Sequence, residues 1–448
     1  MQGQAGRRDG AMAAARRAPT CIAPRLASHP YLPFPSGRKP RKPRPMSTHS
    51  EVPPADDRIG AFIPGPRVTC APLGSGRLSG RSFAVKDLFD VAGAVTTYGH
   101  PDWARTHPQA VATAPVVTAL LQAGAALVGK TKTVELAFGL TGENVWHGTP
   151  RNPAAPDRFP GGSSAGSAAA VAGGAADFAL GSDTAGSVRI PASYCGLYGI
   201  RPSYGAISLA GARGLAPSLD TAGWFARTAS LLSGVGEVLL PGGPAELGGP
   251  LLRVEDAWVN AQPDVAEALR PALERLEQLR GRAIGVRLVP EGIDSLYDHM
   301  RMVQAEEIWA TLGAWIEATA PQFGPGVAER FAAARAVDPS DSGRGRAFRR
   351  GFQARIRPLL EGGAILVLPT SPCPAPLLTA SLAEQDSVRQ ATIGVTAIAG
   401  ACGLPEITLP AGQVRGAPVG LSLLAGPGRD RALLAFACDA ASVLGLPV

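Results

Sequence analysis

Residues 159–191 read FPGGSSAGSAAAVAGGAADFALGSDTAGSVRIP, and this nearly uncharged stretch decides how the rest of the chain is interpreted. The small side chains of 165–176 predict a helix pressed tightly against its neighbours. Residues 178–180 predict a short buried strand, and 181–187 predict a loop whose backbone N–H groups face one point. Such N–H clusters bind anions or developing negative charge. A plain glycine- and alanine-rich packing element between two turns has the same composition.

Two serines in this stretch and one lysine far upstream form a longer pattern. Ser187 lies 24 residues after Ser163 and is followed by VRIPA, while SFAVKDLFD supplies Lys86 next to Asp87. The pattern resembles the signature of the amidase signature family. That resemblance implies a Ser-Ser-Lys catalytic set without histidine, in which Ser187 is the nucleophile, Ser163 the bridging serine and Lys86 the base.

The same resemblance assigns the loop before the nucleophile. It places the oxyanion hole at the backbone N–H groups of Thr184, Ala185 and Gly186, together with that of Ser187 itself. Ala185 stands where glycine is common in the family, and its methyl group would narrow this region. In the family the bond before the bridging serine is cis, which implies a cis peptide bond between residues 162 and 163 here.

A lysine can act as a base only if its surroundings remove its charge. With an ordinary pKa of about 10.4, a lysine is neutral at pH 7 in only about one molecule in 2,500, but burial lowers such a pKa by up to about 3–5 units. The residues around Lys86 are apolar, which favours a buried position (Phe83, Ala84, Val85, Leu88, Phe89). A lone lysine in a strand is otherwise more often a solvated surface charge.

Two other features near the nucleophile have separate interpretations. Asp183 and Arg189 flank it, and we expect them to form an ion pair that supports the loop, since carboxylate and guanidinium pair bidentately. Direct binding of a substrate carboxylate by Arg189 is the less favoured alternative. Residues 162–166 also fit G-x-S-x-G, the nucleophile elbow of α/β-hydrolases, with Ser164 as nucleophile. That chemistry needs a later histidine, and His299 lies in a charged stretch that does not resemble an active site.

Composition excludes several classes of protein. The chain has 448 residues, 45% of them hydrophobic, which is enough for one large core or two small domains. Its formal charge of +7 comes from the first 50 residues, so the body is not a basic nucleic-acid binder. We find no apolar run long enough for a membrane span, no metal-ligand spacing, and six scattered cysteines that suggest reduced thiols. We expect a cytoplasmic enzyme with no cofactor and no metal, and a homodimer is one option.

Strands alternate with helices after the first segment of the chain. Residues 1–57 are rich in arginine, proline and alanine and are expected to be disordered. We favour Met46 as the true start of translation; a transit peptide or a phosphate-binding arm is the alternative. Residues 58–448 are expected to form one α/β amidase domain, with a mixed, mostly parallel central sheet covered by helices on both faces.

Several segments look closer to plant-type indole-3-acetamide hydrolases than to the family at large, including HPDWARTH (100–107), GENVWHGTPRNP (142–153) and QFGPGVAER (322–330). The favoured substrate is therefore a small arylacetamide or another neutral primary amide. Phe138, Trp146 and Trp224 are candidates for its pocket and equally for plain core. An amidotransferase A subunit that releases ammonia from glutamine is the first alternative, although it commonly carries glutamine where this chain has Ile190. A catalytically inactive receptor or scaffold is the second alternative.

Overall fold

The computed structural model describes residues 57–242 and 246–448. The expected N-terminal extension therefore lies outside the described residues, except for its last residue. Asp57 is buried, and its carboxylate accepts hydrogen bonds from the backbone N–H groups of Ala61 at 2.9 Å and Phe62 at 3.0 Å. Asp57 thus belongs to the folded domain rather than to the segment before it.

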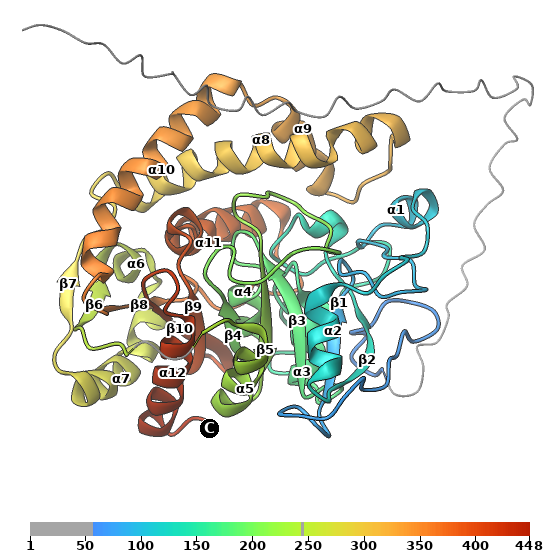
Figure 1. Cartoon of the computed structure of the whole chain (residues 1–448). Helices are drawn as coiled ribbons and strands as arrows, with labels where there is room; N and C mark the ends of the chain where they lie inside the picture. Colours follow the sequence, from blue (N-terminus) through green and yellow to red (C-terminus); the bar gives the residue numbers. More distant parts are fainter. Residues whose placement is uncertain (1–56, 243–245) are drawn as a thin grey trace, which may run out of the picture. The chain divides into compact units, whose positions relative to one another are not determined.

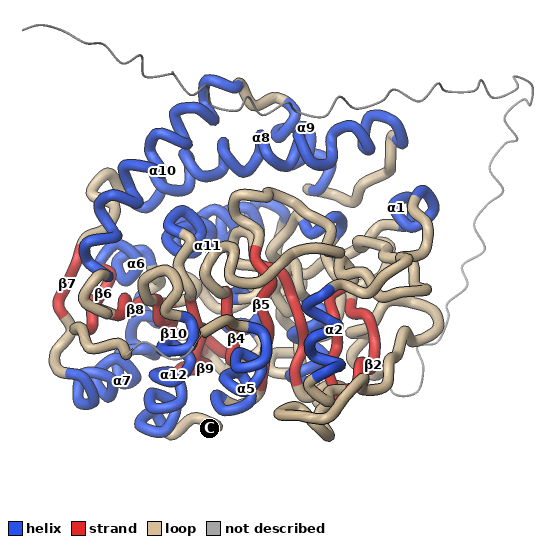
Figure 2. The backbone as a smooth tube through the Cα atoms, in the orientation of Figure 1, coloured by secondary structure: helices blue, strands red, loops and turns tan. Residues whose placement is uncertain are grey.

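One sheet organises this domain, and its strands follow the order β2-β1-β3-β5-β4-β9-β10-β8-β6-β7. Figure 2 shows them as a single row from β7 at the left to β2 at the right. The strands are β1 (Ser82–Lys86), β2 (Ala126–Thr131), β3 (Phe178–Asp183), β4 (Tyr198–Arg201), β5 (Thr221–Ala226), β6 (Leu251–Val254), β7 (Ile284–Val286), β8 (Ile365–Pro369), β9 (Glu406–Val414) and β10 (Ala417–Leu424).

The sheet is mixed, as predicted, but parallel pairing is not its majority. Its neighbouring strands form four parallel pairs, at the two edges, and five antiparallel pairs, in the middle. The antiparallel part arises partly because β9 and β10 form a tight hairpin. Its turn contains Arg415 and Gly416, both at positive φ, the conformation that short hairpin turns require.

Helices cover both faces of the sheet. They are α1 (Pro101–Thr106), α2 (Pro115–Gln122), α3 (Ala165–Ala172), α4 (Arg189–Tyr194), α5 (Ala229–Leu239), α6 (Glu255–Asn260), α7 (Pro263–Arg280), α8 (Ile293–Thr319), α9 (Val327–Arg335), α10 (Pro339–Leu360), α11 (Leu382–Cys402) and α12 (Asp430–Leu444). Helices α2, α5, α12 and α7 pack in sequence as one layer. Helices α8, α9 and α10 lie together beyond the ends of the strands, and α8 and α10 pack on α11 (Figure 1). No helix in the described ranges is long and apolar enough to cross a membrane.

Alternating side chains of β3 separate the two faces. Phe178 and Leu180 pack into the large core that includes α2, α5 and α12, whereas Ala179 packs with α3 and α4 on the other side. The predicted tight packing of α3 is confirmed. A Cβ atom at Gly166 would lie 2.2 Å from the Ala61 carbonyl oxygen, so only glycine fits at that position. Strand β3 is longer than predicted and ends at Asp183, so the loop toward the second serine begins at residue 184.

Candidate active site

Lys86 ends strand β1 and lies in the middle of the site. Its side chain is fully buried, and its Nζ donates hydrogen bonds to Ser163 Oγ at 2.7 Å and Ser182 Oγ at 2.9 Å. The strand places Lys86 there because β1 lies between β2 and β3, with Phe83 and Val85 packed in the core. The amine therefore points at the predicted bridging serine.

Burial changes the acidity of this amine. Loss of solvation lowers the pKa of Lys86 from its ordinary 10.5 to about 7, and the nearby carboxylates of Asp183 and Asp220 act in the opposite direction. A pKa near 7 leaves a large fraction of the amine neutral at physiological pH. Lys86 then has the free lone pair that a general base requires.

Ser163 lies in the turn that leads into α3. The Gly162–Ser163 peptide bond is cis, as expected. Ser163 is 1% exposed, and its carbonyl accepts a hydrogen bond from the Val134 N–H at 3.2 Å. The next residue, Ser164, bonds to the backbone of β3 and not to the lysine: its Oγ donates to the Ser182 carbonyl at 3.2 Å and accepts from the Ser182 N–H at 3.3 Å.

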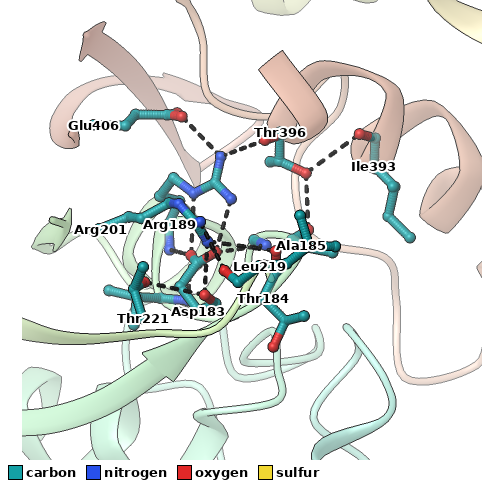
Figure 3. Close-up of polar contacts among 12 residues, drawn as sticks. Asp183, Thr184, Ala185, Arg189, Arg201, Leu219, Thr221, Ile393, Thr396 and Glu406 are labelled. Atoms are coloured by element: carbon teal, nitrogen blue, oxygen red, sulfur yellow. Dashed lines mark hydrogen bonds and ion pairs between the residues drawn. The ribbon is translucent and has the colours of Figure 1, made fainter. Parts of the chain in front are cut away.

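The loop carrying Ser187 is built around the buried carboxylate of Asp183 (Figure 3). This carboxylate accepts from the backbone N–H groups of Gly186 and Val188, both at 2.9 Å, and forms the expected ion pair with Arg189 at 2.7 Å. Arg201 adds a second ion pair at 3.1 Å. Two guanidinium groups hold the pKa of Asp183 well below its usual range despite its burial.

Two residues of α11 and β9 hold the same loop from the other side. The Thr396 hydroxyl donates to the Ala185 carbonyl at 2.8 Å, and the Arg189 guanidinium donates to Glu406 Oε2 at 2.7 Å. The Ser187 carbonyl accepts from the Ser164 N–H at 3.4 Å, which joins the segments of the two predicted catalytic serines. Ser187 itself is 5% exposed.

The predicted oxyanion hole requires one correction. The Gly186 N–H donates to Asp183 Oδ1, so it is not available to a substrate oxygen. Within the described residues, the backbone N–H groups of Thr184, Ala185 and Ser187 have no protein acceptor. The Thr184 hydroxyl donates to Asp220 Oδ1 at 2.6 Å. The N–H groups of Thr184, Ala185 and Ser187 are therefore the donors that this loop can offer.

Sequence reasoning missed four residues of this site. Ser182, Asp220, Thr396 and Glu406 are all buried, and each bonds to the lysine, the nucleophile loop or its supporting arginine. Ser182, Asp220 and Glu406 stand in segments that resemble blocks of the family, GSDTAGSVRIPASYCG (181–196), SLDTAGWFART (218–228) and GLPEITLPAG (403–412), so those segments held a signal. Nothing in the local sequence of Thr396 indicates that α11 reaches the loop.

A cavity of about 280 Å³ adjoins the turn that carries Ser163. Val134 lines it and also bonds to the Ser163 carbonyl, while Thr141 lines it and accepts from the Gly161 N–H at 3.0 Å. The remaining walls come mainly from 139–145, from 325–330 at the start of α9, and from the first turns of α11. The cavity thus shares a wall with the candidate active site.

The three aromatic pocket candidates have different surroundings. Trp224 is fully buried in β5, and its indole N–H donates to the Leu232 carbonyl, so it is core. Phe138 lies between the guanidinium groups of Arg330 and Arg389, at 5.7 Å and 5.8 Å from its ring centroid. Trp146 is 36% exposed and donates to Glu135, which lines the cavity.

His299 does not form the hydrogen bond to Ser164 that a catalytic histidine would need. Its ring stacks on Phe348 of α10 with centroids 4.1 Å apart, and its Nδ1 contacts the Ser295 carbonyl at 2.7 Å. These contacts belong to the layer of α8 and α10, whereas Ser164 bonds to β3. The geometry gives no support to the nucleophile-elbow interpretation.

The α/β sheet brings a buried lysine and several serines to one point, and a loop with free N–H groups lies beside them. This is the arrangement of a serine-type hydrolase. Comparison with known families specifies the class: the family described as Amidase matches residues 72–239 and 252–434. The chain therefore belongs to the amidase family, and it is an amidase.

Individual relatives agree with this family. The chain is 38% identical to Amidase 1 of Arabidopsis thaliana over 417 residues, which cover 84% of this chain and 97% of that protein. It is 34% identical to Translocon at the outer membrane of chloroplasts 64 of Pisum sativum, over 80% of this chain and 65% of that protein. A crystal structure of an amidase superposes with a TM-score of 0.73 at 34% identity, covering 81% of this chain and 84% of that one.

Proposed function

We propose that this amidase hydrolyses a small primary carboxamide to a carboxylate and ammonia, with Ser187 as nucleophile, Ser163 as bridging serine and Lys86 as base. One observation carries the proposal: the Lys86 amine, buried and with a pKa of about 7, lies 2.7 Å from the Ser163 hydroxyl. A structural ion pair would instead join this lysine to a carboxylate.

Acylation starts with two proton transfers. Neutral Lys86 takes the proton of Ser163, and Ser163 takes the proton of Ser187 as the Ser187 oxygen attacks the amide carbon. The negative charge that develops on the carbonyl oxygen is stabilised by backbone N–H groups of the loop, from Thr184, Ala185 and Ser187. Donors fixed in advance at such a position commonly contribute about 10²–10³ in rate.

Collapse of the tetrahedral intermediate breaks the carbon–nitrogen bond. The proton held on Lys86 returns through Ser163 to the leaving nitrogen, which departs as ammonia and leaves the acyl group on Ser187. A water molecule, deprotonated by the same relay, then attacks the acyl ester. The second tetrahedral intermediate then collapses and releases the carboxylate, and the relay returns a proton to Ser187.

An arylacetamide, with indole-3-acetamide as the first candidate, is the proposed substrate. The three segments that look closest to plant-type indole-3-acetamide hydrolases support this choice because they converge near the cavity. Residues of 142–153 and of 322–330 line it directly. His100, from the third segment, contacts the Gln322 carbonyl at 2.9 Å and the rings of Trp146 and Phe323.

The test is ammonia release by the purified full chain from indole-3-acetamide, from glutamine and from a panel of primary amides of increasing acyl size. We expect turnover of an arylacetamide, and its loss in Ser187→Ala. Turnover of glutamine alone, dependent on a co-purifying protein, would favour the amidotransferase alternative. A folded wild-type protein without activity on any amide would favour the scaffold alternative.

A further inference from the structure

Two arginine side chains line the cavity without a carboxylate partner. Arg330 of α9 and Arg389 of α11 are both partly buried and both face the cavity beside Phe138. Within residues 57–242 and 246–448, no carboxylate oxygen lies within the 4.0 Å ion-pair distance of either guanidinium. Two like charges therefore stand close to each other at one cavity.

The two fully buried arginines of the described domain, Arg189 and Arg201, are neutralised. Arg189 pairs with Asp183 and Glu406, both at 2.7 Å, and Arg201 pairs with Asp183 at 3.1 Å. A charge removed from water without a counter-charge is costly, so buried charges in proteins are normally paired. The missing partner of Arg330 and Arg389 is therefore expected to come from outside the chain.

The acidic residues at this cavity do not supply that partner. The Glu135 carboxylate accepts from the backbone N–H of Gly324 and from the Trp146 indole. Glu143 accepts from the Thr141 hydroxyl. Asp386 is exposed, so its charge is screened by solvent.

Arg330 and Arg389 keep free hydrogen-bonding capacity on the cavity side. Arg330 uses its Nε to donate to the Phe138 carbonyl at 3.0 Å. No described residue accepts a hydrogen bond from its Nη atoms, which pack against two glycines: a Cβ at Gly326 would lie 3.1 Å from Nη1, and one at Gly139 would lie 3.5 Å from Nη2. The Nε of Arg389 is buried and has no hydrogen-bond partner, whereas the rest of its guanidinium group interacts with the Tyr297 side chain and, at longer range, with Asp386.

From this geometry we infer that Arg330 and Arg389 form an anion subsite that binds a carboxylate on the acyl part of the substrate. The inference rests on the proposed function and refines its substrate class: among arylacetamides, those that also carry an ionised carboxyl group are preferred over neutral ones such as indole-3-acetamide. Paired guanidinium groups suit this ligand, because their N–H groups match the two oxygens of a carboxylate.

Helix α11 sets the distance between this subsite and the reacting centre. Arg389 precedes Thr396 by seven residues, and Thr396 holds the Ala185 carbonyl of the nucleophile loop. Seven residues of α-helix span about 10 Å. A substrate that satisfies both ends therefore places its carboxylate and its carboxamide on opposite ends of a spacer such as one aromatic ring.

The test compares two amides of similar size, para-(carbamoylmethyl)benzoate and para-methylphenylacetamide, in wild type and in Arg389→Gln. We expect wild type to prefer the carboxylated amide, and the variant to lose roughly tenfold to a hundredfold of its kcat/KM for that amide alone. Arg355→Gln is the matched control, because Arg355 forms an exposed ion pair with Glu291. An unchanged ratio of the two kcat/KM values in Arg389→Gln overturns the inference.

A binding measurement separates this inference from the proposed function. Calorimetry of para-methylbenzoate with Ser187→Ala and with Ser187→Ala/Arg389→Gln needs no turnover. We expect binding to the first protein and at least tenfold weaker binding to the second; equal binding overturns the subsite even if the enzyme is active. If inorganic phosphate competes with the substrate while wild type shows no preference for the carboxylated amide, the two arginines bind a free anion. That outcome also overturns the proposal.

Discussion

At the scale of single residues, the charge state of Lys86 controls the proposed reaction. The base must be neutral, and burial lowers its pKa to about 7, so the active fraction grows as pH rises through 7. We expect kcat/KM for an arylacetamide to increase about tenfold per pH unit below pH 6 and to level off above pH 8. A pH profile of kcat/KM measures this. A midpoint near 10 would contradict a desolvated lysine.

The same shift predicts how stability depends on pH. An unfolded lysine holds its proton up to about pH 10.5, whereas the folded Lys86 releases it above about pH 7. Between these values the unfolded chain binds more protons, so stability rises with pH. The free-energy cost of burying this charged amine therefore destabilises the folded state fully below pH 7 and disappears above about pH 10.5.

Lys86→Met removes the free-energy cost of burying the charged amine, and it also removes the two hydrogen bonds that the amine donates. The cost at pH 7 is about 4 kcal/mol, and the two bonds are worth about 1 kcal/mol each. We expect the variant to be inactive and more stable than wild type by about 2 kcal/mol at pH 7, with the gain vanishing near pH 9. Urea unfolding at both pH values tests this, and a variant less stable at pH 7 than wild type would count against it.

Ser164 distinguishes the bridging-serine mechanism from a nucleophile elbow. Ser164→Ala removes two buried hydrogen bonds to Ser182, which we expect to cost about 1–3 kcal/mol of stability. Its activity should stay within about tenfold of wild type, because the hydroxyl bonds to the backbone of β3 and not to Lys86. Comparing ammonia release with that of Ser163→Ala checks this. An inactive but folded Ser164→Ala protein would restore the elbow interpretation.

At this scale the sequence indicated candidate catalytic residues but not the contacts that hold their loop. The family resemblance singled out Lys86, Ser163 and Ser187, and the first two lie 2.7 Å apart. The use of the Gly186 N–H by Asp183 could not be read from the sequence, because it depends on how the loop bends around a buried carboxylate. Glu406 reaches Arg189 from 217 residues away, and no local pattern encodes that contact.

At the scale of elements, the nucleophile loop depends on Asp183 as its common acceptor. The carboxylate joins the backbone of 186–189 to two buried guanidinium groups. Asp183→Asn leaves Arg189 with Glu406 only and leaves Arg201 without an ion pair. We expect a loss of about 3–5 kcal/mol of stability and a large fall in kcat. Urea denaturation and steady-state kinetics measure both. A Ser203→Ala variant, which loses a buried hydrogen bond to Asp430 far along the chain, controls for general destabilisation.

Pairing between elements was the part of the fold that the sequence predicted least well. Buried strands such as β3 and β8 read clearly as apolar runs, and the alternation with helices indicated an α/β domain. The same alternation suggested mostly parallel pairing, since parallel strands need helical crossovers. β4, β5, β9 and β10 instead pair antiparallel with their neighbours, and this choice is made by packing between distant segments.

At the scale of the whole molecule, the cavity wall is assembled from distant parts of the chain. His100 precedes α1, yet its ring contacts the Gln322 carbonyl after α8 and the ring of Trp315 within α8. Glu135 accepts from the Gly324 N–H in the same loop. The layer of α8–α10 is thereby anchored to the part of the domain that carries Ser163. The sequence marked 100–107 and 322–330 as unusual, but it gave no sign that they touch.

This anchoring predicts a defect in substrate binding rather than in chemistry. His100→Ala removes a buried hydrogen bond and three ring contacts, which frees the 320–326 loop without touching Lys86. We expect KM for an arylacetamide to rise roughly tenfold while kcat stays within about threefold, because only the interactions that hold substrate in the cavity weaken. His299→Ala is the matched control: it removes a histidine of the same helical layer that contacts Phe348 instead, and both constants should stay unchanged. Equal effects of the two variants would mean that the layer acts only through overall stability. A large loss of kcat in His299→Ala would instead indicate that a histidine takes part in the reaction.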